Sequence, residues 1–350
     1  MKAGPKGRQV EVVVVGAGPI GIETAVELGK AGVTALVLDA GAIGQQILDF
    51  PPATRWFSSP ERLGIGGIPF TTPAGEKGTR EQYLAYLRAV VDAFAVQVAT
   101  YRRVVSIENL PGTDGFQLST RSLSGLTHQI TARTLVMATG GTARPRRLGI
   151  PGEDLPHVHR SLGEPHRFHG RRLVVVGGKN SACDAAVLAY RCGARVTLCH
   201  RGPGIHERVK YWIKPELDAM LKSGQITGCF NSQLERIDPS GVVVRSVEDG
   251  SESHIEADDV LLSIGFESDQ SLLAGLGVRL VGSEQAVEHD SQTMETNVAG
   301  VHVAGTAVAG TQARFKVYIE NSHVHARRIA AALTGGVPPE EPVYNELPES

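Results

Sequence analysis

Short apolar runs recur along the chain, and each is followed by a glycine directly or within two residues. The runs lie at residues 12–15, 135–138, 173–176 and 260–264. Strands that are buried on both faces of a sheet read as short continuous apolar runs of this kind. Elsewhere, apolar residues recur at helical spacing, for example over residues 81–94. The pattern predicts an α/β protein whose strands are followed by tight glycine turns.

The first apolar run opens a unit of strand, turn, helix and strand, and its turn reads Gly-Ala-Gly-Pro-Ile-Gly at residues 16–21. In a dinucleotide-binding turn, Gly16 would permit the tight bend, and Gly18 would let the backbone approach a pyrophosphate. Gly21 would allow the helix to pack closely, and the helix N-terminus offers N–H groups to phosphates. The second strand ends on Asp39, where a carboxylate can accept hydrogen bonds from a ribose diol. The unit predicts a dinucleotide site; the alternative is a glycine-rich turn in another kind of α/β protein.

A second unit of the same kind starts at residues 173–176 and continues through Gly-Gly-Lys-Asn-Ser-Ala at residues 177–182. Lys179 stands where the middle glycine would be, and the second strand ends in His200 and Arg201 instead of an acid. A guanidinium can clamp a 2′-phosphate bidentately, whereas an acid would repel it, so this unit predicts NADPH. The alternative is NADH beside a solvated Arg201. Further cations that can join the site are Arg208 and Lys210.

The length of 350 residues and the two dinucleotide units predict two domains. A stretch rich in proline, glycine and arginine at residues 144–153 indicates a linker. The strand at residues 260–264 and the turn and strand at residues 296–306 indicate a return to the first domain. We therefore expect two Rossmann-like dinucleotide-binding domains, the second inserted into the first. The expected bounds are 1–142 with 269–350 for the first domain and 143–268 for the second.

Composition and charge mainly exclude kinds of partner and site. The net charge is −2, so nothing predicts a nucleic acid partner. No apolar run approaches the ~18 residues that cross a bilayer, so no membrane contact is expected. Four cysteines fit a reducing compartment, and we expect a cytoplasmic protein. A cluster of histidines lacks the spacing of metal ligands, so no metal site is predicted. Its members are His157, His159, His166 and His169.

A split first domain with an inserted second one is the plan of flavoproteins that bind two dinucleotides. The motifs Gly-Ala-Gly-Pro at 16–19, Ala-Thr-Gly at 138–140 and the turn at 177–182 resemble those of the low-molecular-weight thioredoxin reductases. A further set is similar to the YpdA-type bacillithiol disulfide reductases within that family, and the likeness spans nearly the whole chain. This set comprises Trp-Phe-Ser-Ser at 56–59, Leu-Gly-Ile-Gly at 63–66, Trp-Ile-Lys-Pro-Glu at 212–216, Met-Glu-Thr-Asn at 294–297 and Tyr-Ile-Glu-Asn at 318–321.

The resemblance implies that the first unit binds FAD, that the second binds NADPH, and that the protein is a homodimer. Hydride would pass from the nicotinamide to the flavin, and a helix expected at residues 317–333 would point its N-terminus toward the flavin. The expected FAD site comprises Gly16, Gly18, Pro19, Ile20, Gly21, Asp39, Ala40, Gln45, Gln46, Ala138, Thr139, Gly140, Gly305, Thr306 and Lys316. The expected NADPH site comprises Gly177, Gly178, Lys179, Asn180, Ser181, His200 and Arg201.

The chain departs from this family at the cysteines. Thioredoxin reductases carry Cys-x-x-Cys ahead of the second fingerprint strand, but residues 143–172 contain no cysteine, and Arg160 and Gly163 fall at those two positions. The bacillithiol branch is expected to use one cysteine in the first glycine turn, where this chain has Ile20. The family's Gly-Asp at the last flavin strand is Gly305–Thr306 here, so Thr306 would bond a ribityl hydroxyl without charge. The usual dithiol relay is therefore not predicted, and no catalytic residue is assigned.

The four cysteines of the chain all lie in the second predicted domain. Cys183 and Cys192 fall on the helix of the second unit, and Cys199 falls on its second strand. Cysteines in such apolar surroundings are mostly inert, so we expect these three to be structural. Cys229 receives no assignment.

Three functions are compatible with these residues. The first is an enzyme that passes hydride from NADPH to FAD and then to a disulfide-type acceptor, in the manner of a bacillithiol disulfide reductase but without a redox cysteine pair. The second is an NADPH–ferredoxin, flavodoxin or quinone reductase on the same scaffold. The third is a protein that senses flavin and NADPH and acts through a partner. The expected partner is accordingly a small-molecule disulfide or a small redox protein.

Overall fold

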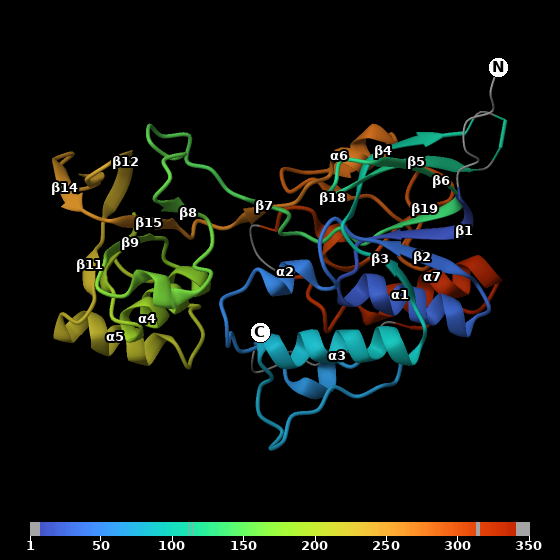
Figure 1. Cartoon of the computed structure of the whole chain (residues 1–350), viewed down its shortest axis with the longest axis horizontal. Helices are drawn as coiled ribbons and strands as arrows, with labels where there is room; N and C mark the ends of the chain where they lie inside the picture. Colours follow the sequence, from blue (N-terminus) through green and yellow to red (C-terminus); the bar gives the residue numbers. More distant parts are fainter. Residues whose placement is uncertain (1–7, 111, 114, 313–315, 341–350) are drawn as a thin grey trace. The chain divides into compact units, whose positions relative to one another are not determined.

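The computed structural model describes residues 8–110, 112–113, 115–312 and 316–340 of the chain. Its contacts divide the chain into two compact units. Unit 1 comprises Met1–Leu48, Ala53–Arg144 and Glu267–Ser350, and unit 2 comprises Asp49–Pro52 and Pro145–Phe266. The chain thus leaves unit 1, builds most of unit 2, and returns to unit 1 for its C-terminal part (Figure 1).

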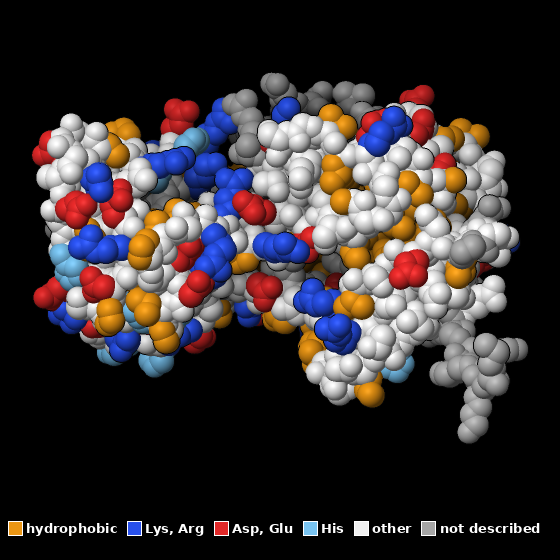
Figure 2. Space-filling model, turned by 90° about the horizontal axis from the view of Figure 1, so that it is seen from above, with side chains coloured by type: hydrophobic (Ala, Val, Ile, Leu, Met, Phe, Trp, Pro, Cys, Tyr) orange, Lys and Arg blue, Asp and Glu red, His pale blue; other side chains and the backbone are white. Residues whose placement is uncertain are grey.

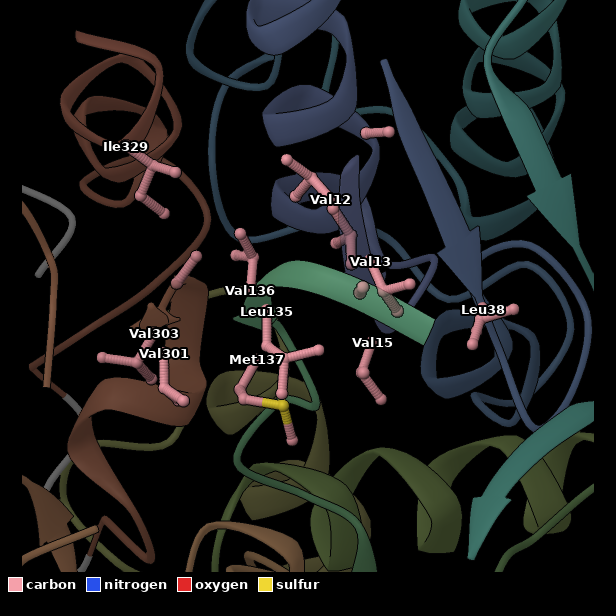
Figure 3. Packing of buried hydrophobic residues seen from close by; sticks show 14 of the residues in the cluster. Val12, Val13, Val15, Leu38, Leu135, Val136, Met137, Val301, Val303 and Ile329 are labelled. Carbon is pink, nitrogen blue, oxygen red and sulfur yellow. The ribbon is translucent and has the colours of Figure 1, made fainter. Parts of the chain in front are cut away.

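Unit 1 is built on a sheet whose central strands are parallel. The strands β3 (Gln97–Ala99), β2 (Ala35–Leu38), β1 (Arg8–Val15) and β6 (Thr127–Met137) lie in this order, and β19 (Val301–Val303) pairs with the carboxyl end of β6. The apolar runs predicted as strands at residues 12–15 and 135–138 thus lie side by side in the middle of the sheet. Figure 3 shows Leu135, Val136 and Met137 of β6 beside Val301 and Val303, with Ile329 above them.

Helices cover one face of this sheet. Figure 1 shows α1 (Pro19–Lys30) and α7 (His323–Thr334) side by side against the strands. The helix α3 (Arg80–Ala93) lies outside α1 and begins with a capping box made by Thr79 and Gln82. Between α1 and α3, a second apolar layer surrounds the fully buried Tyr83. The sheet is thereby closed on this face by two layers of helix.

A β-meander extends the sheet of unit 1. The strand β5 (Phe116–Ser122) pairs antiparallel with the amino-terminal half of β6, and β4 (Arg102–Asn109) pairs antiparallel with β5. The strand predicted from the apolar run at 135–138 is longer than that run, because β6 begins at Thr127 and continues without interruption to Met137. One strand can serve both pairings because its first half neighbours β5 and its second half neighbours β19.

Unit 2 contains a five-stranded parallel sheet. Its order is β11 (Thr227–Cys229), β10 (Arg195–Cys199), β9 (Arg172–Val176), β15 (Asp259–Leu262) and β8 (Val158–His159). Side chains alternate between its two faces, as strand geometry requires. One face packs on the helices α4 (Asn180–Arg191) and α5 (Lys214–Ser223). The other packs on the antiparallel strands β12 (Ser232–Asp238), β13 (Gly241–Ser246) and β14 (Glu252–Glu256).

The remaining elements are short. They are α2 (Gln45–Leu48), α6 (Ser271–Gly275), the 3-10 helices η1 (Pro60–Arg62), η2 (Pro165–Phe168) and η3 (Gly305–Ala309), and the two-residue strands β7 (Arg144–Pro145), β16 (Phe266–Glu267), β17 (Leu280–Val281) and β18 (Ala286–Val287). Within the described ranges, no helix has the length and apolar character that a bilayer crossing requires. Acidic and basic side chains are interspersed on the face drawn in Figure 2, as the small net charge leads one to expect.

The expectation of a helix over residues 317–333 is wrong at its start, because α7 begins only at His323. The side chain of Asn321 accepts a hydrogen bond from the Tyr318 N–H group and donates one to the Lys316 carbonyl oxygen. This local turn satisfies backbone groups that a helix would otherwise need, so the helix starts later. Directly after Thr306 the chain instead forms η3, a single 3-10 turn.

Candidate functional sites

The glycine turn of unit 1 brings three backbones together. Gly16 has φ +115°, and a Cβ placed on it would lie 2.2 Å from the Ala138 carbonyl oxygen. A Cβ on Gly21 would lie 1.9 Å from the Gly16 carbonyl oxygen. Gly18, by contrast, has no atom within 4 Å of such a Cβ. The first and third glycines are therefore required for packing, whereas the middle one leaves space above the turn.

Asp39 ties this turn to the end of β2. Its Oδ2 atom accepts a hydrogen bond from the Ala17 N–H group at 2.6 Å, and its Oδ1 atom accepts one from the Gly41 N–H group at 2.7 Å. Burial raises the pKa of Asp39, while these two donors act in the opposite direction. Each oxygen keeps a further lone pair, so the carboxylate can also accept from a ligand hydroxyl. Ala40, the next residue, is half-buried.

Two glutamines at the start of α2 flank the same turn. Gln45 Oε1 accepts from the Ala42 N–H group at 2.9 Å. Gln46 Nε2 donates to the Thr139 carbonyl oxygen at 3.2 Å, and its Oε1 accepts from Thr142 Oγ1 at 2.9 Å. Gln46 lies so close to Gly140 that a Cβ there would come within 2.6 Å of it. The glutamine thus braces the loop that follows β6.

The hydroxyl of Thr139 has an unusual environment. Its Oγ1 atom is buried, and it has no hydrogen-bond partner in the part of the chain that the structure describes. A buried hydroxyl without a partner costs about 1–3 kcal/mol. It lies directly after Ala138, whose carbonyl oxygen packs on the glycine turn. This hydroxyl therefore keeps its hydrogen-bonding capacity for a polar ligand.

The loop after β19 completes this side of unit 1. Gly305 has φ +68°, and a Cβ on it would lie 3.2 Å from Ile20 Cβ, so Ile20 packs against this backbone. The Gly305 N–H group donates to His325 Nδ1 at 3.1 Å, and Thr306 Oγ1 accepts from the Gly141 N–H group at 3.0 Å. Burial lowers the pKa of His325 to about 3, so its imidazole is neutral and Nδ1 can accept. The sequence offered no signal for His325.

Two further residues of the expected FAD site also fall in the described part of the chain. Pro19 is the first residue of α1 and follows Gly18, which is the N-cap residue. Lys316 is exposed, and its N–H group donates to Gln312 Oε1 at 2.7 Å.

The glycine turn of unit 2 repeats the plan of the first. Gly177 has φ +144°, and a Cβ on it would lie 2.4 Å from the Ser263 carbonyl oxygen. A Cβ on Gly178 would lie 2.4 Å from the ring of His200, so the imidazole packs against the turn. His200 Nδ1 accepts from the Gly202 N–H group at 3.1 Å, and burial lowers the pKa of His200. The predicted residues Gly177, Gly178 and His200 are thus brought together.

Polar side chains surround this second turn. Lys179 is the N-cap residue of α4 and is exposed, as is Ser181. Asn180 Oδ1 accepts from the Lys210 N–H group at 2.8 Å, which fixes the following loop against the helix start. Arg201 is exposed at the end of β10. No acidic residue stands at this strand end, where unit 1 has Asp39.

Both turns fit a dinucleotide. Neither α1 nor α4 has a side-chain cap at its N-terminus among the residues that the structure describes, so their first N–H groups can bind phosphate oxygens. The space above Gly18 and the orphaned Thr139 hydroxyl suit FAD in unit 1. The exposed cations Lys179 and Arg201 suit a phosphorylated ribose in unit 2.

The positions that would hold the family's cysteine pair serve another purpose here. Arg160 Nη1 donates to Glu153 Oε1 at 2.7 Å, and the N–H groups of Leu148 and Gly149 donate to the same carboxylate at 2.8 Å. Burial opposes the charge of Glu153, but these donors outweigh it and lower the pKa of the carboxyl. This region is therefore held by an ion pair between the buried Glu153 and the partly buried Arg160. Cys183 is buried in the core of unit 2, and burial raises the pKa of its thiol to about 12, as expected of a structural cysteine.

Comparisons with known proteins agree with this geometry. The family model described as pyridine nucleotide-disulphide oxidoreductase matches residues 13–305. A curated relative, bacilliredoxin reductase Bdr of Bacillus subtilis (strain 168), is 34% identical over 93% of this chain and 98% of its own length. The solved structure of the bacillithiol disulfide reductase Bdr (YpdA) from Bacillus cereus is 33% identical, with a TM-score of 0.88 over 94% of this chain and 99% of the other.

A second kind of relative carries a different name. The ferredoxin–NADP reductase of Ignicoccus hospitalis is 30% identical over 84% of this chain and 89% of its own length. The likeness to both kinds of protein extends over most of the chain. With the two sheets and glycine turns described above, it confirms the predicted α/β fold with two Rossmann-like domains.

Proposed function

This chain belongs to the pyridine nucleotide-disulphide oxidoreductase family and is a flavoenzyme that uses FAD and NADPH; from this premise we propose that its acceptor is the disulfide of a low-molecular-weight thiol of the bacillithiol type. The observation that supports this acceptor is the end-to-end likeness to the Bdr proteins of Bacillus subtilis and Bacillus cereus. When both cofactors are bound, they supply hydride transfer from the nicotinamide to the flavin.

We propose that unit 1 holds FAD and unit 2 holds NADPH. In unit 1, the N–H groups at the start of α1 bind the pyrophosphate above Gly18, and Asp39 accepts from the ribose diol. The Thr139 hydroxyl gains a partner on binding. In unit 2, the start of α4 binds the pyrophosphate, and Arg201 with Lys179 binds the 2′-phosphate. This assignment of the two cofactors is supported by the opposite charges of Asp39 and Arg201, which follow the second strand of two otherwise similar units.

The chain does not offer the dithiol relay of thioredoxin reductases at the expected place. Arg160 forms an ion pair with Glu153 there, and residues 143–172 contain no cysteine. Ile20 replaces the single cysteine expected in the first turn, and its side chain packs against Gly305. We therefore propose that the small disulfide takes its electrons without a protein disulfide at either position as an intermediate.

The test is an anaerobic stopped-flow experiment on the purified yellow protein. NADPH is added and the flavin absorbance is followed, and the reduced protein is then mixed with bacillithiol disulfide, ferredoxin, flavodoxin or a quinone. We expect NADPH to bleach the flavin much faster than NADH does, and bacillithiol disulfide to restore its colour. Reoxidation by ferredoxin, flavodoxin or quinone alone would overturn the proposed acceptor.

An NADPH–ferredoxin reductase is the second candidate. It is favoured by the relative from Ignicoccus hospitalis and by Ile20, because such an enzyme needs no thiol in the first turn. The same mixing experiment separates the two candidates. Tight NADPH binding without bleaching of the flavin would contradict both and would leave a sensing protein.

We also propose that the protein is a cytoplasmic homodimer. The dimer is what the resemblance to the thioredoxin reductase-like family implies, and the four free cysteines support a reducing compartment. Light scattering during size-exclusion chromatography should give twice the mass of one chain. A single-chain mass at micromolar concentration would contradict the dimer.

A further inference from the structure

Two cysteines that are 30 positions apart in the sequence are direct neighbours in unit 2. Cys199 is the last residue of β10 and Cys229 is the last residue of β11, and the parallel register pairs them with each other. Adjacent strands lie about 4.8 Å apart, which is within the ~4.4–6.8 Å between the Cα atoms of disulfide-bonded cysteines. Both thiols are free in this structure.

The two side chains point to the same face of the sheet. Cys199 is only 1% exposed and belongs to the apolar cluster that β12 and β13 cover, and Cys229 packs against that cluster while remaining half-buried. β11 is the edge strand of its sheet, so one of the two cysteines is reachable and the other is enclosed.

The two neighbouring thiols affect each other's ionisation. Hydrogen bonding from Cys199 lowers the pKa of Cys229 to about 6, with a smaller contribution from the Ser232 side chain. The same bond and burial raise the pKa of Cys199 well above its ordinary value. Such a pair has one thiol that is mostly ionised at neutral pH beside one that is protonated.

We propose that Cys199 and Cys229 form a redox-active site that reacts with low-molecular-weight disulfides, Cys229 as the attacking thiol and Cys199 as the resolving thiol. The choice of oxidant rests on the proposed function. The Cys229 thiolate attacks one sulfur of the small disulfide, forms a mixed disulfide and releases one thiolate. Cys199 then loses its proton to solvent and attacks the Cys229 sulfur, which releases the second thiolate. One small disulfide thereby becomes two thiols, and the protein gains one disulfide bond.

The backbone of this pair carries the nucleotide turn of unit 2. The Gly177 N–H group donates to the Cys199 carbonyl oxygen at 2.9 Å, and the His200 N–H group donates to the Cys229 carbonyl oxygen at 2.9 Å. His200 packs on Gly178 and precedes Arg201. Disulfides most often have about 5.5–6 Å between their Cα atoms, so bond formation moves the two strand ends apart and displaces the residues proposed to hold the 2′-phosphate. We expect the oxidised protein to have at least a threefold higher KM for NADPH.

The site is tested without NADPH, so that the result does not depend on the proposed reductase activity. The purified holoprotein is incubated anaerobically with 2-hydroxyethyl disulfide, and released thiol, intact mass and cross-linked peptides are measured. We expect two equivalents of thiol, a mass lower by about 2 Da and a bond between Cys199 and Cys229. Cys199→Ser should stop at a mixed disulfide on Cys229, and Cys229→Ser should react at neither position.

The matched control is Cys192→Ser, because Cys192 is also half-buried in unit 2 and should not affect the reaction. No cross-link in the wild-type protein, or an adduct on Cys192 in place of Cys229, would overturn the site. A cross-link that leaves the KM for NADPH unchanged would overturn its coupling to the nucleotide turn. Reductase activity without a cross-link would contradict this inference alone.

Alkylation by iodoacetamide gives a second, independent measurement. The rate at Cys229 should reach half of its maximum near pH 6 and not near pH 9. At pH 7 the larger thiolate fraction and the lower nucleophilicity of a low-pKa thiol together predict a rate about fourfold above that of an ordinary cysteine. Cys199→Ala removes the S–H donor and should raise the midpoint, while Cys199→Ser retains an O–H donor and should raise it less. A wild-type midpoint near 9 would contradict the hydrogen-bonded pair.

Discussion

The glycine turns of the two units share a backbone plan and differ in the residue that ends the second strand. In each turn a glycine of positive φ lies against the carbonyl oxygen of a neighbouring strand, that of Ala138 for Gly16 and that of Ser263 for Gly177. In each, a helix of 12 residues follows, and no described side chain caps its N-terminus. This shared plan supports the proposal of a phosphate site in both units, but it does not by itself select the dinucleotide.

We propose that the residues at the strand ends, Asp39 and Arg201, select the dinucleotide. The two carboxylate oxygens of Asp39 already accept hydrogen bonds within the protein, from the Ala17 and Gly41 N–H groups. The guanidinium of Arg201 forms no hydrogen bond or salt bridge among the residues that the structure describes, and it is exposed. In this proposal Asp39 both braces the turn and binds the cofactor, whereas Arg201 only binds the cofactor. Substitution of Asp39 should therefore weaken cofactor binding by unit 1 more than substitution of Arg201 weakens it in unit 2.

The largest effect is expected for Asp39→Ala. The change removes two hydrogen bonds to a charged acceptor, each worth about 1.5–3 kcal/mol, as well as the acceptor for the ribose. FAD affinity should fall by about 100-fold or more. The measurement is the dissociation constant of FAD for the apoprotein, from flavin fluorescence.

Asp92→Ala is the control for this change, because Asp92 is an exposed acid on α3 in the same unit. It should leave the affinity for FAD unchanged. An Asp39→Ala protein that keeps its FAD through purification would show that the brace is dispensable and that the two strand ends differ less than we argue.

An intermediate effect is expected for Arg201→Asp, which gives unit 2 the strand end of unit 1. Loss of a charge-assisted hydrogen bond and gain of repulsion should raise the KM for NADPH by about 10- to 100-fold. The KM for NADH should change by less than about threefold, because NADH has no 2′-phosphate. Steady-state kinetics with both nucleotides make the measurement.

The control for this variant is Arg195→Ala, at the opposite end of the same strand. It should change neither KM. Equal increases in the KM for NADPH and for NADH would mean that Arg201 supports the fold of the turn and does not select the phosphate.

Sequence patterns revealed the parts of the molecule that local residues determine. The two turns could be predicted because glycine spacing and the flanking apolar runs encode them within about 30 residues. The start of α7 could not, because the Asn321 side chain competes for backbone groups that a helix would use. The pairing of Cys199 with Cys229 was missed because β11 has only three residues, one of them Gly228, and shows no apolar run.

The partners of the turns were also hidden from the sequence. His325 is 20 positions away from the Gly305 N–H group that it accepts from. His200 plays a similar part in unit 2 by accepting from Gly202 and packing on Gly178. Burial lowers the pKa of both histidines, so both units depend on a neutral imidazole beside the turn. This shared feature yields the smallest of the expected effects.

That effect is the acid sensitivity that His325 gives to unit 1. At pH 7 its imidazole is neutral in the folded chain and largely neutral in the unfolded chain, where its pKa is near 6.5. As the pH falls below 6.5, the unfolded chain binds a proton that the folded chain does not bind until about pH 3, so stability is lost. Between pH 7 and 5.5 this histidine should lower the free energy of unfolding by about 1 kcal/mol.

His325→Gln keeps an acceptor for the Gly305 N–H group and does not titrate. The variant should therefore lose about 1 kcal/mol less stability than the wild-type protein between pH 7 and 5.5, as measured by urea unfolding at saturating FAD. His128→Gln, at an exposed position of unit 1, should lose as much as the wild type. If His325→Gln also loses as much as the wild type, burial does not hold the imidazole neutral, and the two units do not share this feature.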